Sequence, residues 1–233
     1  MDRIIDFHPH AFPDRLSMQG ETAQTMWIQN IFTHYGIFFL LTCFLLIPSD
    51  LRAWELIRQQ DNISIYTQSV KHSEIKAIKA VTYVKASMDR LVSLTMDFSF
   101  YPEWITRCKE ARILRDINDN EKIAYAQIDL PWPARDREVI FRNTLSRETT
   151  TGSVTINVQA LPGQPSHNNN IVYLEKLTGS WKFTPLHDGT IEIVANGHCD
   201  PESRLPSWFI NSFIARLAHL NLFNMLQVIA LQQ

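Results

Sequence analysis

The stretch LPSWFINSFIARLAHLNLFNMLQVIALQQ, residues 205–233, decides the fold of this chain. Leu205-Pro206 presets a helix start and Ser207 offers a cap for the first turn, so we predict one helix from there to the C-terminus. Its apolar side chains spread over an arc much wider than the roughly 100° stripe that a surface helix needs. Its narrow polar side consists of Ser212, Arg216, His219 and Gln227 and is interrupted by Phe223.

Three interpretations of this helix are open on its own sequence. It could lie in an ordinary core, or it could span a membrane, or it could cover an apolar cavity so that part of its surface faces a ligand. A membrane span is disfavoured because Asn211, Asn221, Asn224, Arg216 and His219 would lie at hydrocarbon depth, where each is costly.

The composition excludes some partners. The 233 residues are 45% hydrophobic, which is ample for a core, and the formal net charge is −2. Because Lys and Arg form no long runs, we expect no nucleic-acid partner. The three cysteines have no metal-type spacing, although Cys108 and Cys199 could pair in an oxidising compartment.

The N-terminal part predicts export. Residues 1–25 are polar and unpatterned, whereas residues 37–47 form an uncharged apolar run with the length of a signal-peptide core. A cut after Ala53 would remove residues 1–53 as a leader and leave residues 54–233 as the mature domain. We expect this mature domain in the periplasm or outside the cell. The acidic flank before the run is unusual for an export signal, which leaves two alternatives: translation from Met26, or an uncleaved membrane anchor over residues 27–47.

The rest of the chain predicts a sheet. We expect a short helix at residues 54–60, helical pieces at 89–96 and 98–104, and short polar turns between strands, which favour antiparallel neighbours. An antiparallel sheet of this many strands curls, and the C-terminal helix is left to fill its concave face, so the cavity interpretation gains weight. The predicted strands are residues 63–67, 75–84, 111–117, 122–130, 138–147, 153–161, 171–177, 180–185 and 190–198.

Two stretches, in the right order and spacing, resemble the START (steroidogenic-acute-regulatory-protein-related lipid transfer) family. Residues 129–138, DLPWPARDRE, resemble the segment in which a Pro-Trp-Pro turn leads into an Arg-Asp pair that opens a long strand. The chain departs from the family pattern at Glu138, where Asp is commoner, and at residues 202–204, where a Gly is often found. The family's closing pattern is matched by residues 181–185, Gly189, Asp200-Pro201, Leu205-Pro206, Trp208 and Asn211.

The resemblance covers about residues 54–233 and looks like the exported bacterial members. It implies an α+β helix-grip fold: a curved antiparallel sheet wrapped around a long C-terminal helix, with an apolar cavity between them. It also implies that one lipid, such as a sterol or phospholipid, is bound in a tunnel and transferred or presented, with transient membrane contact. We expect no catalysis, no cofactor and a monomer.

The candidate cavity residues come from strand alternation and from the C-terminal helix. All are core candidates as well as ligand contacts. Trp132 could shape the tunnel mouth or fix a turn as a buried aromatic residue, and Arg137 lies in a charged run that could meet a lipid head group. The predicted set is Tyr125, Gln127, Arg137, Phe141, Asn143, Tyr173, Trp181 and Phe183 from strands, and Phe209, Phe213, Leu217 and Leu220 from the helix.

Catalytic motifs are absent from the sequence. There is no Gly-x-Ser-x-Gly elbow and no glycine-rich phosphate loop, and His198, Cys199 and Asp200 alternate faces if they lie on a strand. Two rival functions are an enzyme, such as a cyclase or hydrolase, on the same architecture, and a secreted interaction module whose cavity is filled by side chains.

Overall fold

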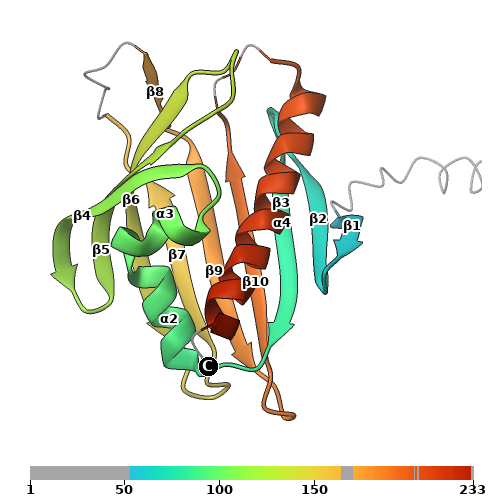
Figure 1. Cartoon of the computed structure of the whole chain (residues 1–233), viewed down its shortest axis with the longest axis vertical. Helices are drawn as coiled ribbons and strands as arrows, with labels where there is room; N and C mark the ends of the chain where they lie inside the picture. Colours follow the sequence, from blue (N-terminus) through green and yellow to red (C-terminus); the bar gives the residue numbers. More distant parts are fainter. Residues whose placement is uncertain (1–52, 164–169, 202, 204, 232–233) are drawn as a thin grey trace, which may run out of the picture. The chain divides into compact units, whose positions relative to one another are not determined.

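One curved sheet forms the frame of the domain (Figure 1) in a computed structural model that describes residues 53–163, 170–201, 203 and 205–231. Within those residues the strand order is β1-β2-β3-β10-β9-β7-β6-β5-β4, all antiparallel, and β8 pairs with β6. The strands are β1 (Glu55–Gln60), β2 (Ile63–Val70), β3 (Ser73–Val84), β4 (Cys108–Asn118), β5 (Glu121–Ile128), β6 (Asp136–Arg147), β7 (Val154–Ala160), β8 (Ile171–Tyr173), β9 (Leu177–Pro185) and β10 (Ile191–Cys199).

The helices lie on one face of this sheet. Figure 1 shows α4 (Ser207–Leu231) running along the strands, with α2 (Met88–Met96) and α3 (Tyr101–Trp104) beside it. The 3-10 turn η1 (Phe98–Phe100) joins α2 to α3, and the Ser87 side chain caps α2 by accepting a hydrogen bond from the Arg90 amide. The α+β helix-grip fold is thereby confirmed, and the leader predicted for residues 1–53 lies outside the described residues except for Ala53.

The helix predicted for residues 54–60 is wrong, because these residues form the edge strand β1. Asp61 and Asn62 both have positive φ, 54° and 59°, as a two-residue hairpin turn of the type that matches strand twist requires. This turn pairs Gln60 with Ile63 and returns the chain along β2. Pairing with β2 therefore decides the structure of residues 55–60, whose short apolar pattern did not strongly favour either a helix or a strand.

The strand predicted for residues 171–177 is also corrected. Only Ile171–Tyr173 is extended, and it pairs with β6 in parallel rather than antiparallel. The next strand, β9, begins at Leu177, earlier than the predicted residue 180.

The polar residues of α4 have structural partners. Asn211 accepts a hydrogen bond from the Lys76 amide at 2.8 Å, and Asn221 accepts one from the Thr106 amide at 2.8 Å. Asn224 donates to the carbonyl oxygen of Trp104 at 3.1 Å. Although α4 is long and apolar enough to cross a membrane, these contacts attach it to β3 and to the segment after α3.

His219 does not lie on an exposed polar side of α4 as the projection predicts. It is buried, its ring stacks on Phe223, and its Nε2 lies 3.3 Å from an Asp61 carboxylate oxygen at the β1–β2 turn. Ser212, Arg216 and Gln227 are exposed, as predicted. The polar side of the helix is thus even narrower than its sequence suggests.

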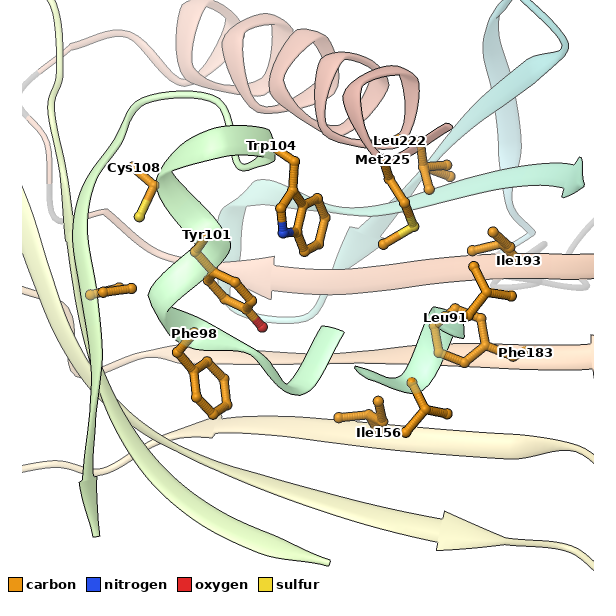
Figure 2. Packing of buried hydrophobic residues seen from close by; sticks show 14 of the residues in the cluster. Leu91, Phe98, Tyr101, Trp104, Cys108, Ile156, Phe183, Ile193, Leu222 and Met225 are labelled. Atoms are coloured by element: carbon orange, nitrogen blue, oxygen red, sulfur yellow. The ribbon is translucent and has the colours of Figure 1, made fainter. Parts of the chain in front are cut away.

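The core fills the space between the sheet and the C-terminal half of α4 (Figure 2). Leu222, Met225 and Ile229 are the α4 residues buried there, and they share one face of the helix at i, i+3 and i+7. The other large, fully buried side chains are Trp104, Phe98, Phe183, Ile63, Ile65, Leu91, Ile156, Ile193 and Val154.

Candidate ligand-binding tunnel

A cavity of about 620 Å³ lies beneath the N-terminal half of α4, and we call it the tunnel. Its volume is in the range of about 300–1,000 Å³ that small-molecule sites occupy. The α4 side chains that line it recur with helical spacing, so this half of the helix faces the tunnel while the C-terminal half faces the core. They are Trp208, Phe209, Ile210, Phe213, Ile214, Leu217, Ala218 and Asn221.

The strand side of the tunnel is built from inward-facing residues of the curved sheet. Val139 and Phe141 alternate along β6, and Val158 pairs across from that strand on β7. On β5 the inward position next to them is Ala126, whose small side chain leaves room for the tunnel. The wide apolar arc of α4 therefore has two partners, a filled core and an open tunnel.

Six of the twelve predicted residues line the tunnel, and whether they contact a ligand stays a prediction. Arg137, Phe141 and Trp181 do so from the sheet, and Phe209, Phe213 and Leu217 do so from α4. Asn143 and Phe183 are fully buried but lie beyond the lining, and Leu220 is half-buried on α4 outside it.

The other three predicted residues do not line the tunnel. Tyr125 donates to Glu138 at 3.3 Å, and Gln127 donates to Asp136 at 3.1 Å, both among partly exposed groups. On β5 the buried positions are Ala124 and Ala126, because strand residues alternate faces. The prediction selected the face of this strand that carries Tyr125 and Gln127, whereas the tunnel is lined by Ala126 and Ile128 on the other face. Tyr173 lies on the short strand β8 and donates to the carbonyl oxygen of Leu161.

Several lining residues were not predicted from the sequence. Tyr101, Ile105 and Thr106 come from α3 and the segment after it, and Cys108 opens β4. The sequence predicted a helical piece at residues 98–104, but nothing in its spacing indicated that it closes a cavity.

Both described cysteines lie in the tunnel wall as free thiols. Burial raises the pKa of Cys108 to about 11. Burial raises the pKa of Cys199 to about 12, and the negative charge of nearby Asp200 contributes to this increase. The positive charge of Arg137 acts in the opposite direction. Both thiols are therefore protonated at neutral pH, and neither resembles an activated nucleophile.

Arg137 is the basic side chain among the tunnel-lining residues. It is only 5% exposed, and its guanidinium donates to the carbonyl oxygen of Pro201 at 2.9 Å and to that of Arg135. These hydrogen bonds fix the Arg137 side chain between the start of β6 and the loop that precedes α4.

The tunnel mouth is formed by residues 130–134 and 205–209, and it exposes aromatic side chains to solvent. Trp132 is 90% exposed and Trp208 is 71% exposed, although both also border the tunnel. Trp132 thus lies at the mouth and is not a buried aromatic residue that fixes a turn. The peptide bond between Trp132 and Pro133 is cis.

The described residues provide no group of three or more His, Cys, Asp or Glu side chains that could hold a metal ion. His198 contacts the Ser73 hydroxyl at 3.3 Å and the carbonyl oxygen of Ile75 at 3.1 Å, whereas the adjacent Cys199 lines the tunnel. These two neighbours therefore have separate surroundings, as strand alternation requires.

A curved antiparallel sheet that grips a long helix over an apolar tunnel defines a helix-grip protein with an internal ligand site. The START domain family model matches residues 42–232, and this chain belongs to that family. Together, the family and the tunnel support the binding of a lipid or another apolar molecule.

Three similar proteins illustrate this relationship. An uncharacterised protein of Pseudomonas aeruginosa is 30% identical over 161 residues, which cover 69% of this chain and 79% of that protein. The crystal structure of a STAR-related lipid transfer protein from Xanthomonas axonopodis matches with a TM-score of 0.70 and 21% identity, over 76% of this chain and 98% of that one. Human StAR-related lipid transfer protein 5 matches with a TM-score of 0.67 and 14% identity, over 82% and 92% of the two chains.

Proposed function

We propose that this protein takes a single lipid or similar apolar molecule into the tunnel and transfers or presents it without catalysing a reaction. The tunnel of about 620 Å³ beneath α4 is the observation that carries the proposal. Burying an acyl chain gains about 0.8 kcal/mol per methylene, but a bilayer offers nearly the same gain. Net exchange is therefore close to neutral, and both loading and release are possible.

Loading requires an opening at the mouth. The start of α4 and the loop before it border the tunnel through Pro201, Ser203, Leu205 and Pro206, so a movement of this segment would admit a ligand. The two exposed tryptophans at the mouth support a transient contact with a bilayer, because tryptophan favours the interface between lipid and water.

The proposal of a non-catalytic role rests on the chemistry of the lining. Ionisable groups are few there: Arg137 is bound to backbone carbonyl oxygens, and burial raises the pKa values of Cys108, Cys199 and Tyr101. A general acid or base that works near neutral pH needs a pKa near that value.

We also propose that the protein acts outside the cytoplasm, either exported to the periplasm or medium or anchored through residues 27–47. N-terminal sequencing of the protein expressed in a bacterial host tests this proposal. A mature chain that begins at Trp54 supports cleavage, a longer chain in the membrane fraction supports the anchor, and a full-length cytoplasmic chain contradicts both.

Mass spectrometry of organic extracts of the purified full-length protein tests binding. A co-purified lipid at about one molecule per protein, and movement of lipid between vesicles in its presence, are the expected results. Replacing Phe213 and Leu217 together by Asp should abolish uptake, because two carboxylates would face the apolar tunnel. The control places Asp at the exposed Ser212 and Gln227 of the same helix and should retain uptake. An empty wild-type protein that takes up no offered lipid would contradict the proposal.

A further inference from the structure

The inner end of the tunnel has a fully buried polar side chain next to it, Asn143 of β6. Both its amide nitrogen and its amide oxygen are inaccessible to solvent, and neither makes a hydrogen bond of regular geometry in the part of the chain that the structure describes, although the amide interacts with the Tyr101 hydroxyl. A buried amide without a partner destabilises the folded state, so such groups are rare in native proteins. Its presence therefore calls for a functional explanation.

The position of Asn143 relative to the tunnel follows from the sheet register. Phe141, two residues earlier on the same face of β6, lines the tunnel. Val158, the residue directly paired with Asn143 on β7, also lines it. Because paired residues of antiparallel strands place their side chains side by side on one face, the Asn143 amide lies one step beyond the lining and away from the mouth.

Tyr101 lies beside Asn143 and lines the tunnel, but it does not satisfy the amide. Burial raises the pKa of the Tyr101 hydroxyl, and a hydrogen-bonding interaction with the Asn143 side chain lowers it in part, in which the amide N–H can only be the donor. The hydroxyl donates its one proton to the carbonyl oxygen of Thr95 at 2.7 Å. The amide oxygen of Asn143 therefore receives no proton from Tyr101.

A second buried polar group without a partner in the described part of the chain, the indole nitrogen of Trp104, lies on a ring that packs against Tyr101. Figure 2 shows Trp104 next to Tyr101, and the two rings meet edge to face with centroids 5.3 Å apart. Trp104 also packs at 5.7 Å against Trp181, which lines the tunnel, and its buried indole nitrogen has no partner among the described residues. Asn143 thus offers one donor group and one acceptor, and Trp104 offers a further donor.

This set of groups favours one kind of ligand atom. A hydroxyl can accept a hydrogen bond from an amide N–H and donate one to the amide oxygen at the same time, whereas a carbonyl oxygen can only accept. A carboxylate would bring a charge to a place where the described lining has no basic group, since Arg137 lies at the opposite end of the inward face of β6.

We propose that Asn143 recognises a neutral hydroxyl group, so that the ligand of the tunnel is an apolar molecule with a hydroxyl at the end that enters first. This inference rests on the proposed function, because it concerns the same tunnel. The amide is already removed from water in the free protein, so a hydroxyl that reaches it gains two hydrogen bonds at little additional desolvation of the protein.

The test compares 1-dodecanol with dodecane in displacing a fluorescent apolar probe from the full-length protein. The two ligands differ in their free energy of hydration, but this difference is the same for every protein variant. The informative quantity is therefore the ratio of their dissociation constants, compared between variants. Replacing Asn143 by Leu should reduce the preference for the alcohol about tenfold relative to the wild type. The second variant, Asn143→Val, suits a β-strand and should show the same loss.

A control is available on β3, where the Thr82 side chain is also fully buried but neither it nor its β10 partner Ile193 lines the tunnel. Thr82→Val should leave the preference for the alcohol unchanged. The thermal midpoint of Asn143→Leu should equal or exceed that of the wild type, because an unpaired amide is removed.

Three results would overturn the inference. Folded Asn143 variants that retain the wild-type preference would show that the amide does not meet the ligand, while the carrier function stands. Unfolding of both variants would assign Asn143 a purely structural role. Failure of the wild type to bind either compound or any other apolar molecule would count against the proposed function itself.

Discussion

The Nε of Arg137 on β6 donates to the carbonyl oxygen of Pro201 at 2.9 Å, which joins the tunnel wall to the loop before α4. The two residues are far apart in sequence, and both border the tunnel. Because Arg137 is 5% exposed, its charge is stabilised by groups of the protein, these carbonyl oxygens among them, rather than by water. The start of α4 is therefore positioned in part by a residue of the sheet.

Replacing Arg137 by Met should lower the free energy of unfolding by about 2–3 kcal/mol, since hydrogen bonds to charged groups each contribute about 1.5–3 kcal/mol. Urea denaturation followed by circular dichroism measures this change. The conservative Arg137→Lys should also lose stability, because an ammonium group lacks the planar fork of donors that reaches several carbonyl groups. Arg115 is exposed on β4, so Arg115→Met is the control and should change stability little. Equal midpoints for Arg137→Met and the control would contradict this role.

Asn221 provides a second test of how α4 is attached. Its side-chain oxygen accepts the Thr106 amide hydrogen at 2.8 Å, so Asn221→Leu would leave that partly buried amide without this partner. We expect a loss of about 1–2 kcal/mol in the free energy of unfolding, measured by urea denaturation. Gln227→Leu, at an exposed position on the same helix, should be nearly neutral. A stability of Asn221→Leu equal to that of this control would show that the bond has no net effect.

The sequence predicted the fold well where a periodic pattern was long. The C-terminal helix, the strands predicted between residues 111 and 161 and the last strand are found close to their predicted bounds, and the excess apolar surface of the helix correctly indicated a cavity. The failure at residues 54–60 has a local cause, because the turn at Asp61 and Asn62 adopts positive φ and so makes a hairpin that the composition of β1 did not suggest.

The candidate site was predicted less well, for geometric reasons. On β5 the prediction selected Tyr125 and Gln127, but the residues of this strand that line the tunnel are Ala126 and Ile128, which lie on the opposite face. The contribution of Tyr101 depends on how α3 folds back over the sheet. Sequence periodicity within one element does not describe such an arrangement between elements.

The two tunnel cysteines should react slowly with iodoacetamide at pH 7.5. Burial raises the pKa of Cys108 to about 11 and that of Cys199 to about 12, so each thiol stays protonated and the thiolate fraction is very small. Because the folded-state pKa values are raised, alkylation should accelerate as the pH increases towards 10. Mass spectrometry of the native protein, with the urea-unfolded protein as the reference, measures the rates.

Ligand in the tunnel should slow this alkylation further, since both thiols line it. Protection by 1-dodecanol of both cysteines would agree with a single shared site. Rapid modification at neutral pH, at the rate of the unfolded chain, would contradict the buried positions of these side chains.

The exposed tryptophans at the mouth should control binding to membranes. Trp132 is 90% exposed and Trp208 is 71% exposed, so the free protein keeps two large aromatic side chains in water. Replacing both by Ser should reduce the partitioning of the protein onto phosphatidylcholine vesicles at least about tenfold, because inserting each ring removes apolar surface from water. Co-sedimentation with vesicles measures this partitioning.

The same double variant separates membrane contact from ligand binding. Its affinity for 1-dodecanol added in the absence of vesicles should change little, because the inner part of the tunnel is intact, whereas its rate of lipid transfer between vesicles should fall together with vesicle binding. Leu114 is 41% exposed on β4 and does not line the tunnel, so Leu114→Ser controls for the loss of any exposed apolar side chain. If Leu114→Ser reduced vesicle binding as much as the tryptophan replacements, contact with the bilayer would not be confined to the mouth, and the tunnel would lack a direct route to its ligand.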